Sequence, residues 1–241
     1  MPELSWLQIG LLFGLVVAGA MLQGVVGYGM ALIVSPAALL LAPPLIPGPL
    51  TLAAAALVGL IIVRDRQALD FLSLRWALLG LVGGSALGAF LLSRVSQREF
   101  ALLFGGLILL AVGLSVIGVR FPPRRPILLG AGFLAGLMGL LTTISGPPIA
   151  LVYQDAPGKQ LRATISGFFV AGIVVTLVSL ATIGRFGLAE IGWGLALVPP
   201  VLLGFWLSGR AARWVDRGYT RPAVLAVAAV SALTVLFSQL G

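Results

Sequence analysis

The residues best suited to chemistry lie in two short stretches that interrupt long apolar runs, residues 23–29 and 145–148. Pro147 and Pro148 remove two backbone donors and cannot continue an α-helix, and glycine adopts dihedrals that other residues avoid. A helix that stops and restarts directs free N–H groups and a positive dipole end at the gap, and such ends bind oxyanions. Broken backbone at membrane depth is tolerated where it lines a polar cavity. The pattern therefore predicts an anion site at the two breaks.

The side chains around these breaks are mostly neutral, and Thr176 is a further neutral polar group at depth. A single Ser or Thr in a membrane helix most often bonds to its own backbone, but clustering around two breaks favours a ligand site. Arg162 either supplies a positive charge at the cytoplasmic mouth or only anchors the topology. The hypothesis assigns substrate binding to Gln23, Gly24, Gly27, Tyr28, Gly29, Ser35, Thr142, Thr143, Ser145, Gly146, Pro147, Pro148, Arg162 and Ser166.

Enzyme chemistry is not favoured by the residue types present. The chain has no cysteine and no histidine, which removes thiol chemistry and the commonest metal ligand and general base. Its seven acidic residues all fall near predicted helix ends or at the N-terminus, whereas ionisable groups at the bilayer centre usually mark ion pathways. We therefore expect no catalytic residues, no metal, no cofactor and no buried relay of several acids.

Composition indicates an all-α integral membrane protein. Hydrophobic residues make up 60% of the 241 positions, charged residues 9%, and the mean hydropathy is +1.14. A soluble domain carries roughly a quarter charged residues, and a porin-like barrel would show short alternating segments instead of continuous apolar runs. The net charge of +8 does not indicate nucleic acid, because the basic residues are scattered between apolar runs and resemble topology determinants.

The apolar runs divide the chain into an N-terminal helical repeat (1–119), a connector (120–126) and a C-terminal helical repeat (127–241). Residues 6–22 are expected to stay as a retained first helix, and Gly80, Gly84 and Gly88 are spaced for close contact with a neighbouring helix. Helices are predicted at 6–22, 29–42, 50–63, 76–92, 100–119, 127–142, 147–153, 164–183, 191–208 and 222–239.

Sequence similarity and charge both indicate two five-segment repeats of inverted topology, with short or broken helices near the bilayer midplane. An offset of 112 residues aligns Gly24 with Gly136 and Gly27 with Gly139, and each half has an early Gly/Pro interruption, which is typical of transporter sites. With the N-terminus outside, 12 of the 15 basic residues become cytoplasmic, as the positive-inside rule requires. These are Arg64, Arg66, Arg75, Arg120, Arg124, Arg125, Lys159, Arg162, Arg210, Arg213, Arg217 and Arg221.

The sequence contains three motifs of note: the Gly-rich motif at 23–29, the Ser-Gly-Pro-Pro motif at 145–148 and the later Arg-Ala-Thr at 162–164. Together they resemble the TauE/SafE family of sulfite exporters, and the resemblance covers nearly the whole chain. The resemblance implies a multi-pass protein of the cell inner membrane. It implies secondary transport of a small sulfur-containing anion, such as sulfite, sulfoacetate or thiosulfate, coupled to the proton gradient. A channel for small anions, or a transporter of another organic anion, shares the same sequence features. The expected partners are the small anion, protons as one candidate coupling ion, and the lipid bilayer; the anion, the direction of transport, the coupling ion and the oligomeric state stay open.

Overall fold

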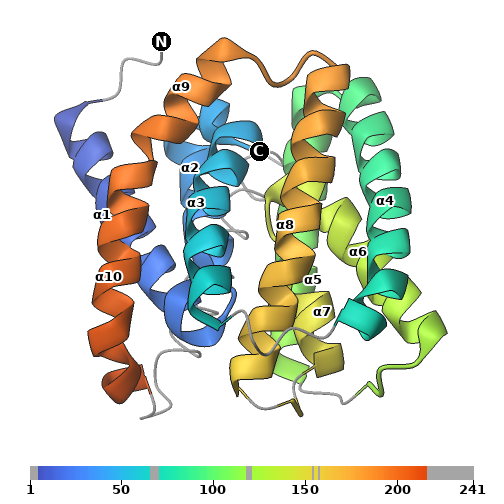
Figure 1. Cartoon of the computed structure of the whole chain (residues 1–241). Helices are drawn as coiled ribbons and strands as arrows, with labels where there is room; N and C mark the ends of the chain where they lie inside the picture. Colours follow the sequence, from blue (N-terminus) through green and yellow to red (C-terminus); the bar gives the residue numbers. More distant parts are fainter. Residues whose placement is uncertain (1–4, 66–70, 118–120, 154, 157, 216–241) are drawn as a thin grey trace.

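The computed structural model describes residues 5–65, 71–117, 121–153, 155–156 and 158–215, and all regular structure in these residues is helical. The predicted helix 222–239 lies outside the described residues, as do Arg66, Arg120, Arg217, Arg221 and the side chains of Lys159 and Arg213. The elements (Figure 1) are α1 (Trp6–Val26), α2 (Met30–Leu41), the 3-10 helix η1 (Pro43–Leu45), α3 (Gly48–Asp65), α4 (Phe71–Arg94), α5 (Gln97–Ile117), α6 (Arg125–Thr142), α7 (Gly146–Tyr153), α8 (Gly158–Thr182), α9 (Leu188–Ala196) and α10 (Val198–Val215).

Six helical segments of the described chain are long and apolar enough to cross a membrane. They are Trp6–Val26, Leu74–Arg94, Gln97–Leu114, Arg125–Thr142, Gln160–Thr182 and Leu188–Arg210. Large apolar side chains point outward from them: Leu79 is 61% exposed, Val174 56% and Trp206 58%. Because soluble monomers rarely leave large apolar patches exposed, the structure confirms an all-α, multi-pass membrane protein.

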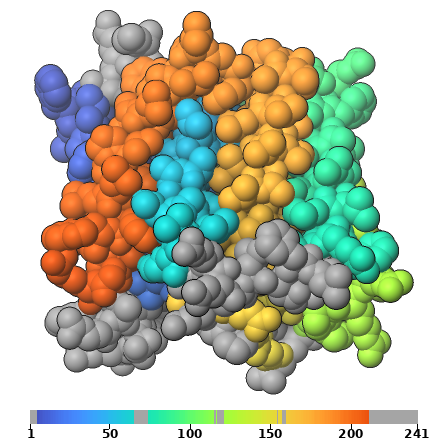
Figure 2. Space-filling view, in the orientation of Figure 1, coloured from blue at the N-terminus to red at the C-terminus, as the bar shows by residue number. Residues whose placement is uncertain are grey.

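The helices pack as two bundles. In the first bundle, α1, α2, α3 and α10 share one apolar core, with α9 packed beside it and α1 lying closely along α10. In the second bundle, α4, α6, α7 and α8 share another core, and α5 packs against α6 and α7. The two bundles meet mainly along α3 and α8, which lie side by side in Figure 2.

Glycine permits the closest helix contact in the second bundle, between α4 and α6. A Cβ atom at Gly80 or Gly84 of α4 would overlap the backbone of α6, and one at Gly132 or Gly136 of α6 would overlap the backbone of α4. The predicted role of the α4 glycines in close helix packing is therefore confirmed. Small residues at such a crossing allow two backbones to approach in a membrane, where packing holds helices together.

A Gly84→Ala substitution should therefore lower the yield of folded protein. The added Cβ would collide with the Phe133 carbonyl oxygen, and overpacking of this kind costs about 1–3 kcal/mol. Fluorescence-detected size-exclusion chromatography after mild heating measures the effect. Gly83→Ala is the matched control, because its Cβ would make only ordinary contact, 3.5 Å from the Phe133 ring. Equal yields for the two variants would contradict the packing assignment.

Several helix boundaries differ from the sequence prediction, and two of the differences have a clear physical reason. First, α1 continues to Val26, so Gln23 and Gly24 lie inside the helix and the first break covers only residues 27–29. The glycine-rich composition of 23–29 predicted an earlier end, but Gly24 tolerates the helical conformation because it packs closely on α10. The interruption is therefore shorter than predicted.

Second, the single helix predicted over 191–208 is two helices that separate at Leu197. Pro199 and Pro200 at the start of α10 carry no N–H, so the helical hydrogen-bond ladder cannot pass through them. The first turn of a new helix accommodates proline well. The same Pro-Pro signal that predicted the break before α7 was present here and was missed.

Candidate functional site

The first break (residues 27–29) and the second break (residues 143–145) lie against each other. The Tyr28 side chain packs over Gly146 so closely that a Cβ atom on this glycine would lie 2.8 Å from Tyr28 Cβ. Ser35 of α2 is hydrogen bonded to Thr143 at an Oγ to Oγ1 distance of 2.5 Å, although the two residues are 108 positions apart. The fold thus joins two distant interruptions at one place.

Glycine is needed at both ends of the first break. Gly27 ends α1 with a φ of 100° and Gly29 precedes α2 with a φ of 125°, a region that other residues rarely adopt. Gln23 Oε1 accepts a hydrogen bond of 3.1 Å from the Met30 N–H, one of the donors that the start of α2 leaves free. Gln23 therefore fixes the start of α2 relative to the last turn of α1.

Hydrogen bonds hold the second break in a strained conformation. Thr143 has a φ of 62°, which is rare for a β-branched residue. Beside it, Thr142 Oγ1 donates to the Met138 carbonyl at 2.7 Å and accepts from the Ile144 N–H at 3.2 Å. Thr143 Oγ1 donates to the Thr142 carbonyl, so the Ser35 hydroxyl is the donor in its bond to Thr143. Backbone strain held in this way is typical of functional sites.

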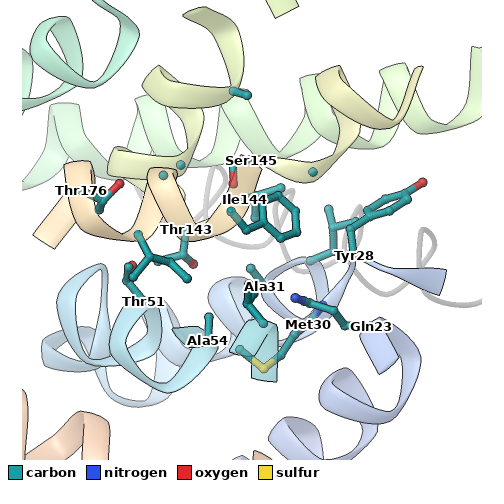
Figure 3. A pocket seen from close by; sticks show the side chains of 18 of the residues that line it. Gln23, Tyr28, Met30, Ala31, Thr51, Ala54, Thr143, Ile144, Ser145 and Thr176 are labelled. Carbon is teal, nitrogen blue, oxygen red and sulfur yellow. The ribbon is translucent and has the colours of Figure 1, made fainter. Parts of the chain in front are cut away.

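A cavity lies where the two breaks meet (Figure 3). Leu81 and Gly172 line it, and they lie about halfway along α4 and α8. About 60 Å³ of it is open to the centre of a water-sized molecule, whereas one water needs roughly 10–15 Å³. The cavity therefore has room for a solute of a few heavy atoms. Both bundles contribute to its wall, and its polar side chains are Gln23, Tyr28, Thr51, Thr143, Ser145 and Thr176.

The cavity wall is polar without being charged, since the described residues that line it include no Asp, Glu, Lys or Arg. Thr51, Thr143 and Thr176 lie at one side and Gln23 at the other, while the Tyr28 hydroxyl points away from the other labelled side chains (Figure 3). Because Gln23 uses its oxygen for Met30, its amide NH₂ is the group left for a solute. Such a wall can hold a small polar or anionic solute by hydrogen bonds.

Two helices begin at this cavity, α2 at Met30 and α7 at Gly146. Their positive dipole ends both face the cavity. Pro147 and Pro148 have no N–H, so the first turn of α7 offers fewer free donors than the first turn of α2, which has no proline. The start of α2 is therefore the better-equipped end for binding an oxyanion.

The structure brings half of the predicted site residues to the cavity wall: Gln23, Tyr28, Gly29, Thr143, Ser145, Gly146 and Pro147. Ser35 and Thr142 stand directly behind that wall, where they hydrogen bond to the second break. Pro148 is buried within α7 and does not line the cavity. Ser166 is fully buried in α8, outside the lining, and its Oγ has no hydrogen-bond partner among the described residues.

The remaining predicted residues, Gly24, Gly27 and Arg162, meet at the end of α1. Gly24 packs against α10, where a Cβ would lie 2.5 Å from Ser208 Oγ, and a Cβ on Gly27 would lie 3.0 Å from Arg162 Cγ. Arg162 lies inside α8, which begins at Gly158 and not near 164 as predicted. Its stem packs against the first break from outside the cavity.

Sequence reasoning missed three contributions. Thr51 lines the cavity from α3, and its hydroxyl donates to the Pro47 carbonyl at 2.8 Å. Thr176 was recognised as polar at depth but was not assigned to the site. Arg64 of α3 donates to the Gly24 carbonyl at 2.7 Å, which satisfies an acceptor that the end of α1 would otherwise leave free. The described residues hold no group of three or more His, Cys, Asp or Glu placed to bind a metal.

Comparison with known proteins identifies the family. The profile of the family described as "Sulfite exporter TauE/SafE" matches residues 11–235, which is nearly the whole chain. No curated protein and no solved structure matches the chain. The match includes both helix breaks and every helix that forms the cavity. With this match and its apolar, membrane-crossing helices, the chain belongs to the TauE/SafE family of membrane sulfite and sulfur-anion exporters.

Proposed function

We propose that this chain is a secondary transporter that holds a small sulfur-containing oxyanion, of the sulfite, sulfoacetate or thiosulfate type, in the cavity between its two helix breaks. The observation that carries the proposal is the junction of both breaks at a cavity lined by neutral hydrogen-bond donors. Family membership supports the class of substrate. The position of the cavity, halfway along α4 and α8, supports binding near the bilayer midplane.

Neutral donors can hold an anion without a buried cation. A charge removed from water without partners is strongly unfavourable, but each hydrogen bond to a charged group contributes about 1.5–3 kcal/mol. We assign the donor role to the Gln23 amide, the Ser145 and Thr176 hydroxyls and the first turn of α2. The uncharged wall also lets the anion leave, because the described residues that line the cavity include no countercharge to hold it.

The pairing of helices supports the two inverted repeats, 1–119 and 127–241 joined by the connector 120–126. If α1 corresponds to α6, then α4 corresponds to α9 and α10. The first helix of each repeat then lies against the fourth segment of the other, as α1 lies along α10 and α6 lies along α4. Each bundle would combine the first three helices of one repeat with later helices of the other. Transport would follow from rocking of the two bundles along α3 and α8, with the cavity exposed alternately to either side.

A cysteine-labelling experiment tests the topology. One side of the molecule holds the last turn of α3 and the first turns of α4, α6 and α8 (Figure 1). This side carries most of the described arginines. The positive-inside rule predicts that this side of the molecule faces the cytoplasm. A Pro123→Cys variant of the cysteine-free chain should resist an impermeant thiol reagent in intact cells and react in inverted vesicles. Labelling from outside intact cells would contradict the inverted arrangement.

Counterflow in proteoliposomes tests the function. Vesicles preloaded with sulfite, thiosulfate, sulfoacetate, phosphate or chloride should take up labelled sulfur anion only when they contain a sulfur oxyanion. The exchange should saturate, and an imposed pH gradient should accelerate net movement if protons are coupled. Flux that rises linearly with concentration would indicate a channel. Preference for phosphate or chloride would reject the proposed class of substrate.

A further inference from the structure

Two threonines of the central cavity direct their hydroxyl protons away from it. Thr51 Oγ1 donates to the Pro47 carbonyl at 2.8 Å, at the start of α3. Thr143 Oγ1 donates to the Thr142 carbonyl and accepts a hydrogen bond from the Ser35 hydroxyl, both at 2.5 Å. A hydroxyl group has one proton and two lone pairs, and both protons are used inside the protein. These two oxygens of the cavity wall therefore offer a solute only lone pairs.

The opposite side of the cavity offers only donors. The Met30 N–H donates to Gln23 Oε1 at 3.1 Å, which fixes the orientation of the amide and leaves its NH₂ group for a solute. The first turn of α2 adds backbone N–H groups and a positive dipole end. Thr51 and Thr143 lie on one side of the cavity and Gln23 on the other (Figure 3). The wall therefore has an acceptor side and a donor side.

Ionisable side chains are kept away from this wall. Tyr28 is the one titratable residue of the described lining, and its hydroxyl points away from the other labelled side chains (Figure 3). Ser145 and Thr176 add hydroxyls that can donate or accept. The helices that form the wall carry charged residues only within their first or last two turns. These are Arg64 and Asp65 of α3, Arg75 and Arg94 of α4, Arg125 of α6, and Lys159 and Arg162 of α8. Within the described lining, therefore, no side chain is placed to exchange a proton with the solute.

A solute matches this wall when one end accepts hydrogen bonds and the other end donates one. The fully ionised sulfite, thiosulfate and sulfoacetate ions carry only acceptors, so their lone pairs would face those of Thr51 and Thr143. Hydrogensulfite, in its O–H form, carries one donor and a single negative charge. The cost of removing an ion from water rises with the square of its charge, so it is about four times larger for a dianion than for a monoanion of the same size. Both effects favour the protonated anion.

We propose that the central cavity binds hydrogensulfite, with its O–H directed to the Thr51 and Thr143 oxygens and its charged oxygens directed to the Gln23 amide and the start of α2. The inference rests on the proposed function, because it names the protonation state of the anion at the same site. Hydrogensulfite loses its proton near neutral pH, so the affinity for total sulfite depends on pH although no side chain of the site titrates. One proton crosses with each anion, and it is released where hydrogensulfite dissociates to sulfite.

Isothermal titration calorimetry of the wild type with sulfite and with thiosulfate, between about pH 6 and about pH 8, tests the protonation state. Since hydrogensulfite is the bound form, the affinity for total sulfite should fall about tenfold per pH unit above the pKa of hydrogensulfite. At about pH 8 each bound anion should take up about one proton, measured from the binding enthalpies in buffers of different ionisation enthalpy. Thiosulfate has no proton to lose in this range, so it should bind more weakly and with an affinity that does not depend on pH.

Thr51→Val removes one of the two acceptor oxygens and keeps the shape of the side chain. It should weaken hydrogensulfite binding about five- to tenfold, because a buried donor loses a partner, and leave thiosulfate binding within about twofold of wild type. Thr182→Val is the matched control, because the exposed Thr182 hydroxyl makes the same kind of bond, to the Ser179 carbonyl at 2.8 Å, outside the cavity. It should bind both anions as wild type does. Thr51→Ser keeps the acceptor and should retain the preference for hydrogensulfite.

Two results would overturn the inference while saturable sulfite exchange still upholds the proposed function. One is an affinity for total sulfite that stays constant or rises with pH, without proton uptake. The other is a folded Thr51→Val variant that loses affinity for both anions equally. Absence of saturable sulfite binding and exchange in the wild type at every pH would overturn both the inference and the proposed function.

Discussion

A Gly146→Val variant should reach the membrane folded and yet fail to transport. Its side chain would enter the space where Tyr28 crosses the start of α7, since even a Cβ atom there would lie 2.8 Å from Tyr28 Cβ. The two breaks would have to separate. Overpacking costs about 1–3 kcal/mol, and a loss of that size in binding free energy corresponds to about 5- to 150-fold weaker anion binding. Uptake in proteoliposomes, normalised to folded protein, measures the loss.

Gly130→Val in α6 is the matched control, because nothing lies within 4 Å of a Cβ at that exposed position. It should transport normally. Ser145→Ala should have a milder effect than Gly146→Val, since one neutral hydrogen bond contributes about 0.5–1.5 kcal/mol. Normal uptake by correctly folded Gly146→Val would remove the second break from the transport site.

A Ser35→Cys/Thr143→Cys variant should lose transport when oxidised and regain it when reduced. These side chains lie on opposite bundles, and their hydroxyl oxygens are 2.5 Å apart, so two cysteine sulfurs at these positions can reach bonding distance. A disulfide there would tie α2 to the second break and stop the bundles from rocking apart. Uptake before and after treatment with a reductant measures the effect, and we expect nearly complete inhibition.

The cysteine-free background makes this experiment specific. Each single-cysteine variant should be insensitive to oxidation, and its activity reports the cost of losing the Ser35 to Thr143 hydrogen bond. Full activity of the oxidised double variant, with disulfide formation verified by mass spectrometry, would show that transport does not need the bundles to separate at this point.

The helix breaks were the most predictable part of the site, because proline and glycine act on the backbone locally. Ser145-Gly146-Pro147-Pro148 ended one helix and began another as predicted, and the two hydrophobic stretches around it formed α6 and α7. The end of α1 was less predictable, because close packing against α10 keeps Gly24 helical. The break at Leu197 was predictable from Pro199 and Pro200 but was not recognised.

The composition of the cavity wall was less predictable, because it depends on how distant helices rotate against one another. Thr51 and Ser166 look alike in sequence, as hydroxyl residues in apolar helices, yet Thr51 lines the cavity and Ser166 is buried elsewhere. Arg162 could not be placed from spacing alone, because α8 begins earlier than its hydrophobic pattern indicates. Contacts between helices decide these positions, and local sequence carries no direct signal for them.

The most direct test of whether the cavity between the breaks holds the anion is isothermal titration calorimetry of the purified protein with sulfite. The titration is run in parallel for wild type, Gly130→Val and Gly146→Val. Wild type and Gly130→Val should bind about one sulfite per chain with equal affinity, and Gly146→Val should bind about 5- to 150-fold more weakly. Unchanged affinity and stoichiometry in folded Gly146→Val would contradict the assignment of the site.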